Sequence, residues 1–212
     1  MPRMPRRLFL FALALCTFGA ASPRAQETWH EESSRLAAAL HWQAGSVVAE
    51  IGAGDGQLTV LTAERVGPSG TVYSTELDRD KLKHLEELAA KDKNIHAIKA
   101  GEADTNLPEA CCDSIYMRLV YHHLTNPVEI DASLFRSLKS GGRLAVMDEE
   151  PPEGSSVPKG VPKNRLGHGI PQKLLISELV AARFEVEKVD NEWPGRGFSA
   201  PLYCVVFHKA KP

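Results

Sequence analysis

The stretch VVAEIGAGDGQLTVL, residues 47–61, constrains the fold of this chain more than any other part of the sequence. A short, nearly all-apolar run ends at a glycine bend, which is typical of a central strand in a parallel sheet. Three glycines follow at alternate positions, and apolar residues at helical spacing begin at Leu58. Glycine permits positive φ and lets the backbone approach a ligand closely. The stretch therefore predicts a strand, a turn that faces a bound molecule, and a helix.

Strands and helices alternate along the rest of the chain. Apolar or β-rich runs predict seven strands, at residues 46–51, 71–76, 95–99, 114–120, 143–147, 184–189 and 202–208. Helical spacing predicts five helices, at residues 31–40, 58–66, 79–90, 127–138 and 172–182. This order indicates an α/β fold with a doubly wound, Rossmann-like sheet of seven strands, mostly parallel with an antiparallel edge strand.

The first 25 residues have the composition of an export leader. Arg3, Arg6 and Arg7 precede an apolar run at 8–21, which is shorter than the ~20 residues needed to span a bilayer. We therefore expect a leader over residues 1–25, cleaved after Ala21, and one domain over residues 26–212 without a stable membrane span. A used leader predicts a periplasmic or secreted protein, and an unused one predicts a cytoplasmic protein. A buried N-terminal helix is the alternative interpretation of this segment.

Charge distribution bears on the kind of partner. Residues 1–25 contain four arginines and no acid, so the remainder has 21 basic and 27 acidic residues, a net charge of −6. Affinity for nucleic acid comes largely from neutralising phosphates. An acidic body therefore predicts a small-molecule partner and no nucleic acid. The sequence does not indicate an oligomeric state.

The glycines predict where a ligand lies. In an open parallel sheet, ligands bind beyond the carboxyl ends of the strands, where the strand order reverses. Gly52, Gly54 and Gly56 follow the first strand and are expected to line that crevice. A dinucleotide-binding turn starting at Gly52 would need glycine at position 57, where Gln57 stands. The next helix supplies unpaired N–H groups suited to a carboxylate or phosphate.

The pattern E-x-G-x-G-x-G, from Glu50 through Gly56, resembles motif I of the class I S-adenosylmethionine-dependent methyltransferases. The resemblance continues in the segments VYSTELD, AGEADTNLP, CDSIYMRLVYHHL and LKSGGRLAVMDEEPP, so it covers residues 46–150 well and the C-terminal third in outline. It implies S-adenosyl-L-methionine as the cofactor and in-line methyl transfer to a small-molecule acceptor. It also implies that Glu50 and the three glycines contact the cofactor.

Four further cofactor contacts follow from the resemblance. Glu76, at the end of the second strand, is expected to accept hydrogen bonds from the ribose hydroxyls, with a solvated acid as the alternative. Glu102 and Ala103 are expected to face the adenine. This chain has one residue more than the commonest family form after Ala103, which leaves Asp104 open in place of Glu102. Arg118 is expected beside the sulfonium.

Two adjacent histidines follow the fourth strand, in the loop over the methyl group. His123 is the first candidate for a catalytic base and His122 the second, because histidine can titrate near neutral pH. Alternatively, one histidine packs beneath the loop and the other hydrogen-bonds the backbone. Asp148, Glu149 and His168 could reach the same mouth. None of these residues has diagnostic ligand spacing, so the sequence predicts no metal site.

The expected leader and the expected cofactor are in conflict, because the leader predicts export whereas the cofactor is made in the cytoplasm. The protein could meet the cofactor outside, fold around it before export, or leave the leader unused. The alternative function is an exported, non-catalytic module that binds another small molecule in the same crevice. Gly52, Gly54, Gly56 and Glu76 together favour the methyltransferase, because a module without the cofactor has no physical need for all four.

Overall fold

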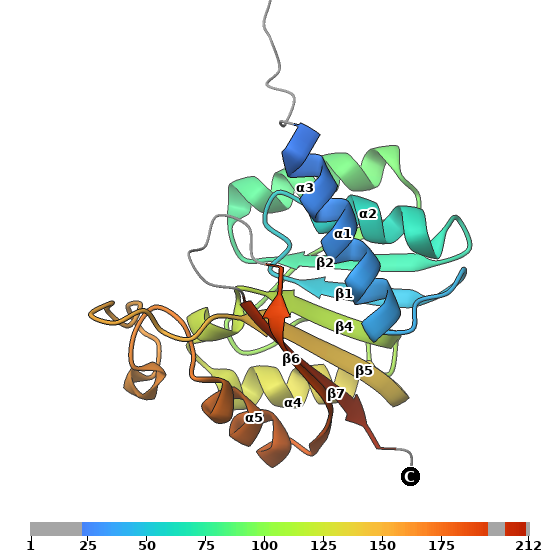
Figure 1. Cartoon of the computed structure of the whole chain (residues 1–212). Helices are drawn as coiled ribbons and strands as arrows, with labels where there is room; N and C mark the ends of the chain where they lie inside the picture. Colours follow the sequence, from blue (N-terminus) through green and yellow to red (C-terminus); the bar gives the residue numbers. More distant parts are fainter. Residues whose placement is uncertain (1–22, 195–201, 211–212) are drawn as a thin grey trace, which may run out of the picture.

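A computed structural model describes residues 23–194 and 202–210 of the chain. It contains a seven-stranded sheet in the order β3-β2-β1-β4-β5-β7-β6 (Figure 1). The strands are β1 (Val47–Ile51), β2 (Thr71–Glu76), β3 (Ile95–Lys99), β4 (Cys112–Arg118), β5 (Leu138–Asp148), β6 (Phe184–Trp193) and β7 (Leu202–Lys209). The pairings among β1 to β5 are parallel, whereas β7 runs antiparallel to both β5 and β6. The predicted fold class is confirmed.

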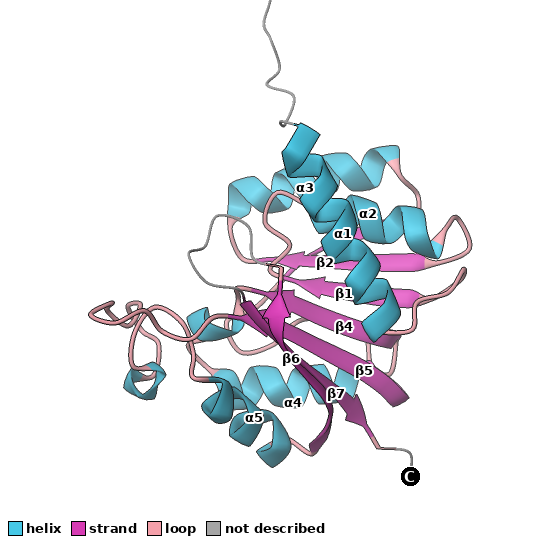
Figure 2. Cartoon of the chain, in the orientation of Figure 1, coloured by secondary structure: helices cyan, strands magenta, loops and turns pink. Residues whose placement is uncertain are grey.

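Helices cover both faces of the sheet. They are α1 (Pro23–Ala39), α2 (Gln57–Val66), α3 (Arg79–Lys91), α4 (Pro127–Ser137) and α5 (Gln172–Ala181), with short 3₁₀ helices η1 (Tyr121–His123) and η2 (Lys163–Arg165). Figure 2 shows α1, α2 and α3 on one side of the strands and α4 and α5 on the other. No described helix is both long enough and apolar enough to cross a membrane.

Two hydrophobic cores hold these layers together. Because successive residues of a strand point to opposite faces, neighbours in β1 enter different cores. Val48 packs with Leu36, Leu58 and their neighbours beneath α1 and α2, whereas Ala49 belongs to the cluster that includes Leu134 of α4. The buried β1 strand thus positions the following turn from both sides.

Several element boundaries differ from the sequence-based prediction, and the largest differences are at the starts of α1 and β5. The α1 helix begins at Pro23, eight residues before the start of the helix predicted at residues 31–40, while residues 1–22 of the predicted leader lie outside the described residues. The β5 strand begins at Leu138 and includes Gly141, which has φ +75°. These residues form an irregular strand entry, with a register shift opposite β4, in place of a helix end.

Candidate active site

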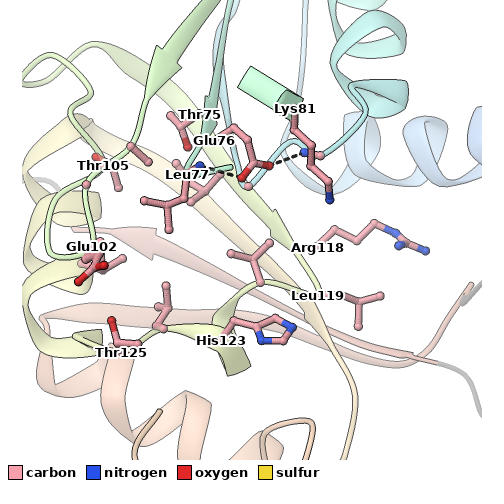
Figure 3. A pocket seen from close by; sticks show the side chains of 18 residues that line it. Thr75, Glu76, Leu77, Lys81, Glu102, Thr105, Arg118, Leu119, His123 and Thr125 are labelled. Carbon is pink, nitrogen blue, oxygen red and sulfur yellow. Dashed lines mark hydrogen bonds between the residues drawn. The ribbon is translucent and has the colours of Figure 1, made fainter. Parts of the chain in front are cut away.

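A crevice of about 490 Å³ lies at the carboxyl ends of the parallel strands. It sits where the strand order reverses between β1 and β4, which is where ligands bind in open α/β sheets. Figure 3 shows Glu76 and Lys81 on one side of it and His123 and Thr125 on the opposite side. The ends of four strands supply its walls, through Gly52, Gly54, Thr75, Glu76, Leu77, Gly101, Glu102, Arg118, Leu119, Val120 and His123.

Each of the three motif glycines is needed at its position for a different structural reason. All have positive φ, at +68° for Gly52, +57° for Gly54 and +74° for Gly56. A Cβ on Gly52 would lie 2.6 Å from Cγ2 of Val120, whereas a Cβ on Gly54 would meet no atom within 4 Å. Gly54 therefore exposes backbone to the crevice, and Gly52 allows the loop after β4 to come close.

Gly56 does not line the crevice, contrary to the expectation from the motif. It is the N-cap of α2, and a Cβ there would lie 2.7 Å from Cδ1 of Leu88 and 3.0 Å from Cδ2 of Leu85. Its small size lets α2 begin directly against α3. Gly56 thus positions the turn and the helix without facing a ligand.

The Glu76 carboxylate lies in the crevice and ties its first two walls together. Oε2 accepts from the Gly54 N–H at 2.9 Å, and Oε1 accepts from the N–H groups of Leu77 at 2.7 Å and Asp78 at 3.0 Å. A carboxylate offers about four lone-pair sites, so about one remains, on Oε2. Glu76, which is predicted to bind the ribose, therefore also stabilises the glycine turn.

Glu50 lies behind the turn. Its Oε2 accepts from the Thr59 hydroxyl at 2.5 Å, and burial raises the pKa of its carboxyl to about 7. It is almost fully buried and does not line the main crevice, although it borders an adjoining hollow with Gly54, Lys81 and Arg118. The geometry gives Glu50 a mainly internal role, in joining β1 to α2.

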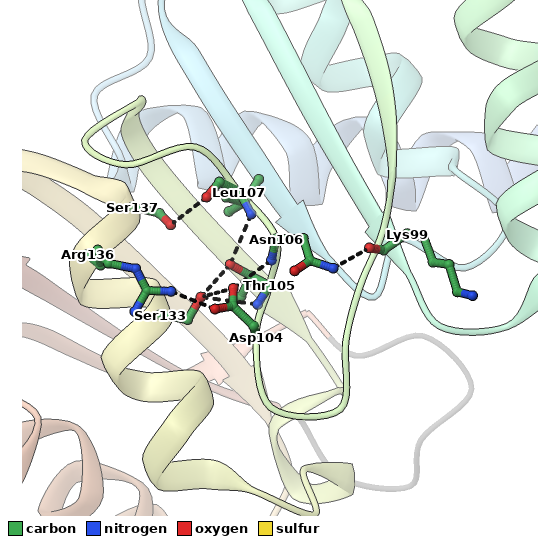
Figure 4. A network of polar contacts seen from close by, with 8 residues as sticks. All are labelled: Lys99, Asp104, Thr105, Asn106, Leu107, Ser133, Arg136 and Ser137. Atoms are coloured by element: carbon green, nitrogen blue, oxygen red, sulfur yellow. Dashed lines mark hydrogen bonds and ion pairs between the residues drawn. The ribbon is translucent and has the colours of Figure 1, made fainter.

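The turn after β3 separates the two candidate acids. Glu102 lines the crevice, whereas Asp104 turns away and accepts from Ser133 at 2.9 Å and Arg136 at 2.7 Å (Figure 4). Hydrogen bonding, led by the Asn106 N–H, lowers the pKa of Asp104. Asp104 is thus committed to the α4 side, and Glu102 is the acid placed to meet a ligand.

Ala103 does not line the crevice, contrary to the expectation from the resemblance. The Gly101 N–H donates to the Asp104 carbonyl at 2.8 Å, which closes a tight turn. Ala103 lies within this turn and is exposed. The turn presents Gly101 and Glu102 to the crevice and Ala103 to the outside.

Arg118 is anchored by α1, which motif spacing did not reveal. Its Nε donates to Glu32 Oε1 at 2.8 Å, and its guanidinium lies 4.7 Å from the centre of the Trp29 ring. Its Nη2 is buried and has no hydrogen-bond partner among the described residues. Lys81 adds a second cation, in the first turn of the helix after Glu76, and this position could have been noticed in the sequence. These two cations can meet an anionic ligand group.

The adjacent histidines separate into two environments. His123 lines the crevice, and burial together with His122 and His168 lowers the pKa of its imidazole. His122 is 1% exposed and does not line the crevice. Its Nδ1 lies 2.7 Å from Asp148 Oδ1, and its backbone N–H donates to Oδ2 of the same carboxylate at 3.2 Å. His122 thus packs beneath the loop, which corrects its candidacy as a base that touches the acceptor.

Comparison with known proteins gives one family. Residues 49–146 match the family described as "Methyltransferase domain". The chain is 26% identical over 129 residues to a demethylmenaquinone methyltransferase of Symbiobacterium thermophilum, covering 59% of this chain and 50% of the relative. It is 30% identical over 114 residues to the ubiquinone/menaquinone biosynthesis C-methyltransferase UbiE of a Marinomonas species, covering 52% and 45%. The chain therefore spans about half the length of the curated relatives it matches.

Solved structures share the fold over most of the chain. A SAM-dependent methyltransferase from Aquifex aeolicus superposes with TM-score 0.67 at 20% identity, covering 83% of this chain and 88% of that one. The [4+2]-cyclase SpnF superposes with TM-score 0.69 at 13% identity, covering 86% and 81%. Likeness at this level shows the fold, on which different chemistries occur. Taken with the motif residues and the crevice, it follows that residues 49–146 form a methyltransferase domain of the class I, S-adenosylmethionine-dependent type.

Proposed function

We propose that this protein binds S-adenosyl-L-methionine in the crevice and transfers its methyl group to a small-molecule acceptor. The observation that carries the proposal is the placement of Gly54, Glu76 and His123 around one cavity of about 490 Å³. Open backbone, an acid that can accept hydrogen bonds and a base thus come from three separate strand ends. The cofactor offers matching groups, namely ribose hydroxyls, a carboxylate and an activated methyl.

The unpaired groups of the crevice fit this cofactor. The remaining lone pair of Glu76 Oε2 can accept from a ribose hydroxyl. Arg118 Nη2, which is buried without a partner among the described residues, can donate to the carboxylate of the methionine part. Lys81 stands on the same side as Glu76 and adds positive charge (Figure 3). Glu76 would therefore meet the nucleoside of the cofactor, and Arg118 would meet its amino acid part.

Methyl transfer needs alignment more than activation, because the methyl on a sulfonium is already electrophilic. The acceptor atom attacks in line, the carbon–sulfur bond breaks, and its electron pair stays on the sulfur of the cofactor. His123 is the ionisable side chain that the loop after β4 brings to the crevice, so it is assigned to take the acceptor's proton. Asp148 and His122 support this loop from below.

The acceptor is assigned only as a small molecule. An acidic body of net charge −6 beyond residue 25 is a poor match for the phosphates of a nucleic acid. The names of two relatives make a demethylmenaquinone the first acceptor to assay. Because the match covers only about half of each relative, the assay should use a panel of acceptors that also includes phenols, thiols and carbon acids.

The test combines binding with turnover. We expect saturable binding of S-adenosylhomocysteine by calorimetry, and transfer of labelled methyl from S-adenosylmethionine to a member of the acceptor panel. His123→Gln should lower turnover and keep cofactor affinity, whereas His84→Gln, on the exposed face of α3, should change neither. Absence of S-adenosylhomocysteine binding would contradict the proposal. Binding without turnover on any acceptor would favour the non-catalytic module.

Export of the protein through its N-terminal leader is a separate proposal. It is supported by the charge and apolar pattern of residues 1–25. Cleavage after Ala21 would leave α1, which begins at Pro23, whole. Mass measurement of the protein in fractions of its native host tests it. We expect the cleaved mass outside the cytoplasm, and a full-length mass confined to the cytoplasm would contradict export.

A further inference from the structure

We propose that His122, His123 and His168 form a binding site for a divalent transition-metal ion at the edge of the crevice. Each histidine offers one ring nitrogen, and these three atoms lie within 4.8 Å of one another. The ring centres are separated by 4.1 Å for His122–His123, 4.8 Å for His122–His168 and 5.0 Å for His123–His168. Three imidazoles with an open fourth position are a ligand set that suits zinc and its neighbours.

The buried histidine has the arrangement of an oriented metal ligand. Asp148 Oδ1 lies 2.7 Å from His122 Nδ1, and a hydrogen on that nitrogen of a neutral ring would leave the lone pair of Nε2 for a metal ion. Nε2 is buried and has no hydrogen-bond partner among the described residues. A buried polar atom without a partner costs free energy, and a bond from Nε2 to a metal ion would offset that cost. A carboxylate that fixes the other nitrogen is the usual support of a histidine on a metal ion.

The loop between β5 and α5 is built to bring His168 close. The Ile170 N–H donates to the Glu149 carbonyl at 3.0 Å, and the His168 N–H donates to the Ser155 hydroxyl at 3.0 Å. Gly169 has φ +152°, and a Cβ there would lie 2.8 Å from the Glu149 carbonyl oxygen. The chain on either side of His168 is thus held against the end of β5, next to Asp148.

Glu149 is a candidate for a fourth ligand. Its Oε1 lies 4.0 Å from His168 Nδ1. A set of three histidines and one carboxylate would remain compatible with zinc.

Binding requires only a small closure of the cluster. Zinc–nitrogen bonds of about 2.0–2.1 Å place ligand nitrogens about 3.4 Å apart in a tetrahedral site. His123 and His168 are exposed and can rotate toward His122, which Asp148 holds in place. The lone pair of His123 would then serve as a ligand, so its role as a base applies to the metal-free protein.

The test measures the metal alone, without cofactor or acceptor, so its result is independent of methyl transfer. The full chain, stripped with a chelator, should bind one Zn²⁺ by calorimetry and give visible absorption bands with Co²⁺. His168→Gln should weaken Zn²⁺ binding at least tenfold, and Asp148→Asn about 10- to 100-fold, as expected for a support of a ligand. The thermal stability of each metal-free variant is measured in parallel, to separate lost folding from lost binding.

His84→Gln is the matched control, because the side chains of His84 and His168 are both 51% exposed. It should leave the stoichiometry and affinity unchanged. Equal Zn²⁺ affinity of the wild type, His168→Gln and His84→Gln would overturn the proposal, as would absence of stoichiometric binding to the wild type. Loss of metal binding with S-adenosylhomocysteine affinity retained would separate this site from the cofactor crevice.

Discussion

The Glu76 carboxylate accepts a hydrogen bond from the Gly54 N–H across 2.9 Å, which ties the end of β2 to the turn after β1. The same acid is assigned to the ribose of the cofactor. It therefore links the shape of the turn to the occupancy of the crevice, and its loss should affect both.

Glu76→Ala should weaken S-adenosylhomocysteine binding at least tenfold, because a hydrogen bond to a charged group contributes about 1.5–3 kcal/mol. Calorimetry measures this change. Glu86→Ala, on the exposed side of α3, is the matched control and should bind normally. Unchanged affinity of Glu76→Ala would remove the ribose assignment.

Gly54→Ala and Gly56→Ala should have opposite profiles. A Cβ at Gly54 enters open space in the crevice, so we expect about 1 kcal/mol of backbone strain and a marked loss of cofactor affinity. A Cβ at Gly56 would press on Leu88 and Leu85, so Gly56→Ala should unfold more easily, by about 2 kcal/mol or more. Thermal melts and calorimetry on both variants would contradict this account if the two changes were indistinguishable.

Arg118→Met should destabilise the fold by about 3 kcal/mol, because it leaves the Glu32 carboxylate buried without its cation. Burial already raises the pKa of Glu32 despite that partner. Adding Glu32→Gln should recover part of the loss, since the double variant buries no charge. Urea unfolding of the two single variants and the double variant measures this coupling. Additive losses would mean that the pair does not act as a unit.

Glu50 should make stability fall as the pH rises. Burial raises the pKa of Glu50 to about 7 in the folded chain, above its ordinary value of 4.5. The folded state then binds more protons than the unfolded state between these values, so the contribution is present below about 4.5 and lost as the pH rises through about 7. Glu50→Gln should remove this loss, on the order of 2–3 kcal/mol between pH 4.5 and pH 8. The free energy of unfolding in urea is measured against pH for the wild type and for Glu50→Gln. Parallel profiles would exclude this contribution of Glu50.

Much of the fold and part of the site follow from local sequence pattern. The apolar runs and helical spacings predict the seven strands and five helices, because each burial pattern repeats within a few residues. The same locality locates the glycine turn and places Glu76 and Glu102 at strand ends beside it.

Contacts between distant parts of the chain decided the rest. Glu32 and Trp29 meet Arg118 only because α1 packs near the end of β4, and nothing in their spacing indicates it. Gly56 and Ala103 fit the motif but lie away from the crevice, because helix packing and a tight turn orient them.

The histidines show the division most clearly. The sequence by itself determined a strand, a glycine turn and a pair of adjacent histidines in the loop after the fourth strand. Only the tertiary structure decided that His122 is buried on Asp148, that His123 faces the crevice, and that His168 joins them from a loop far along the chain. Local pattern records burial along one element, whereas a site depends on which elements the sheet brings side by side.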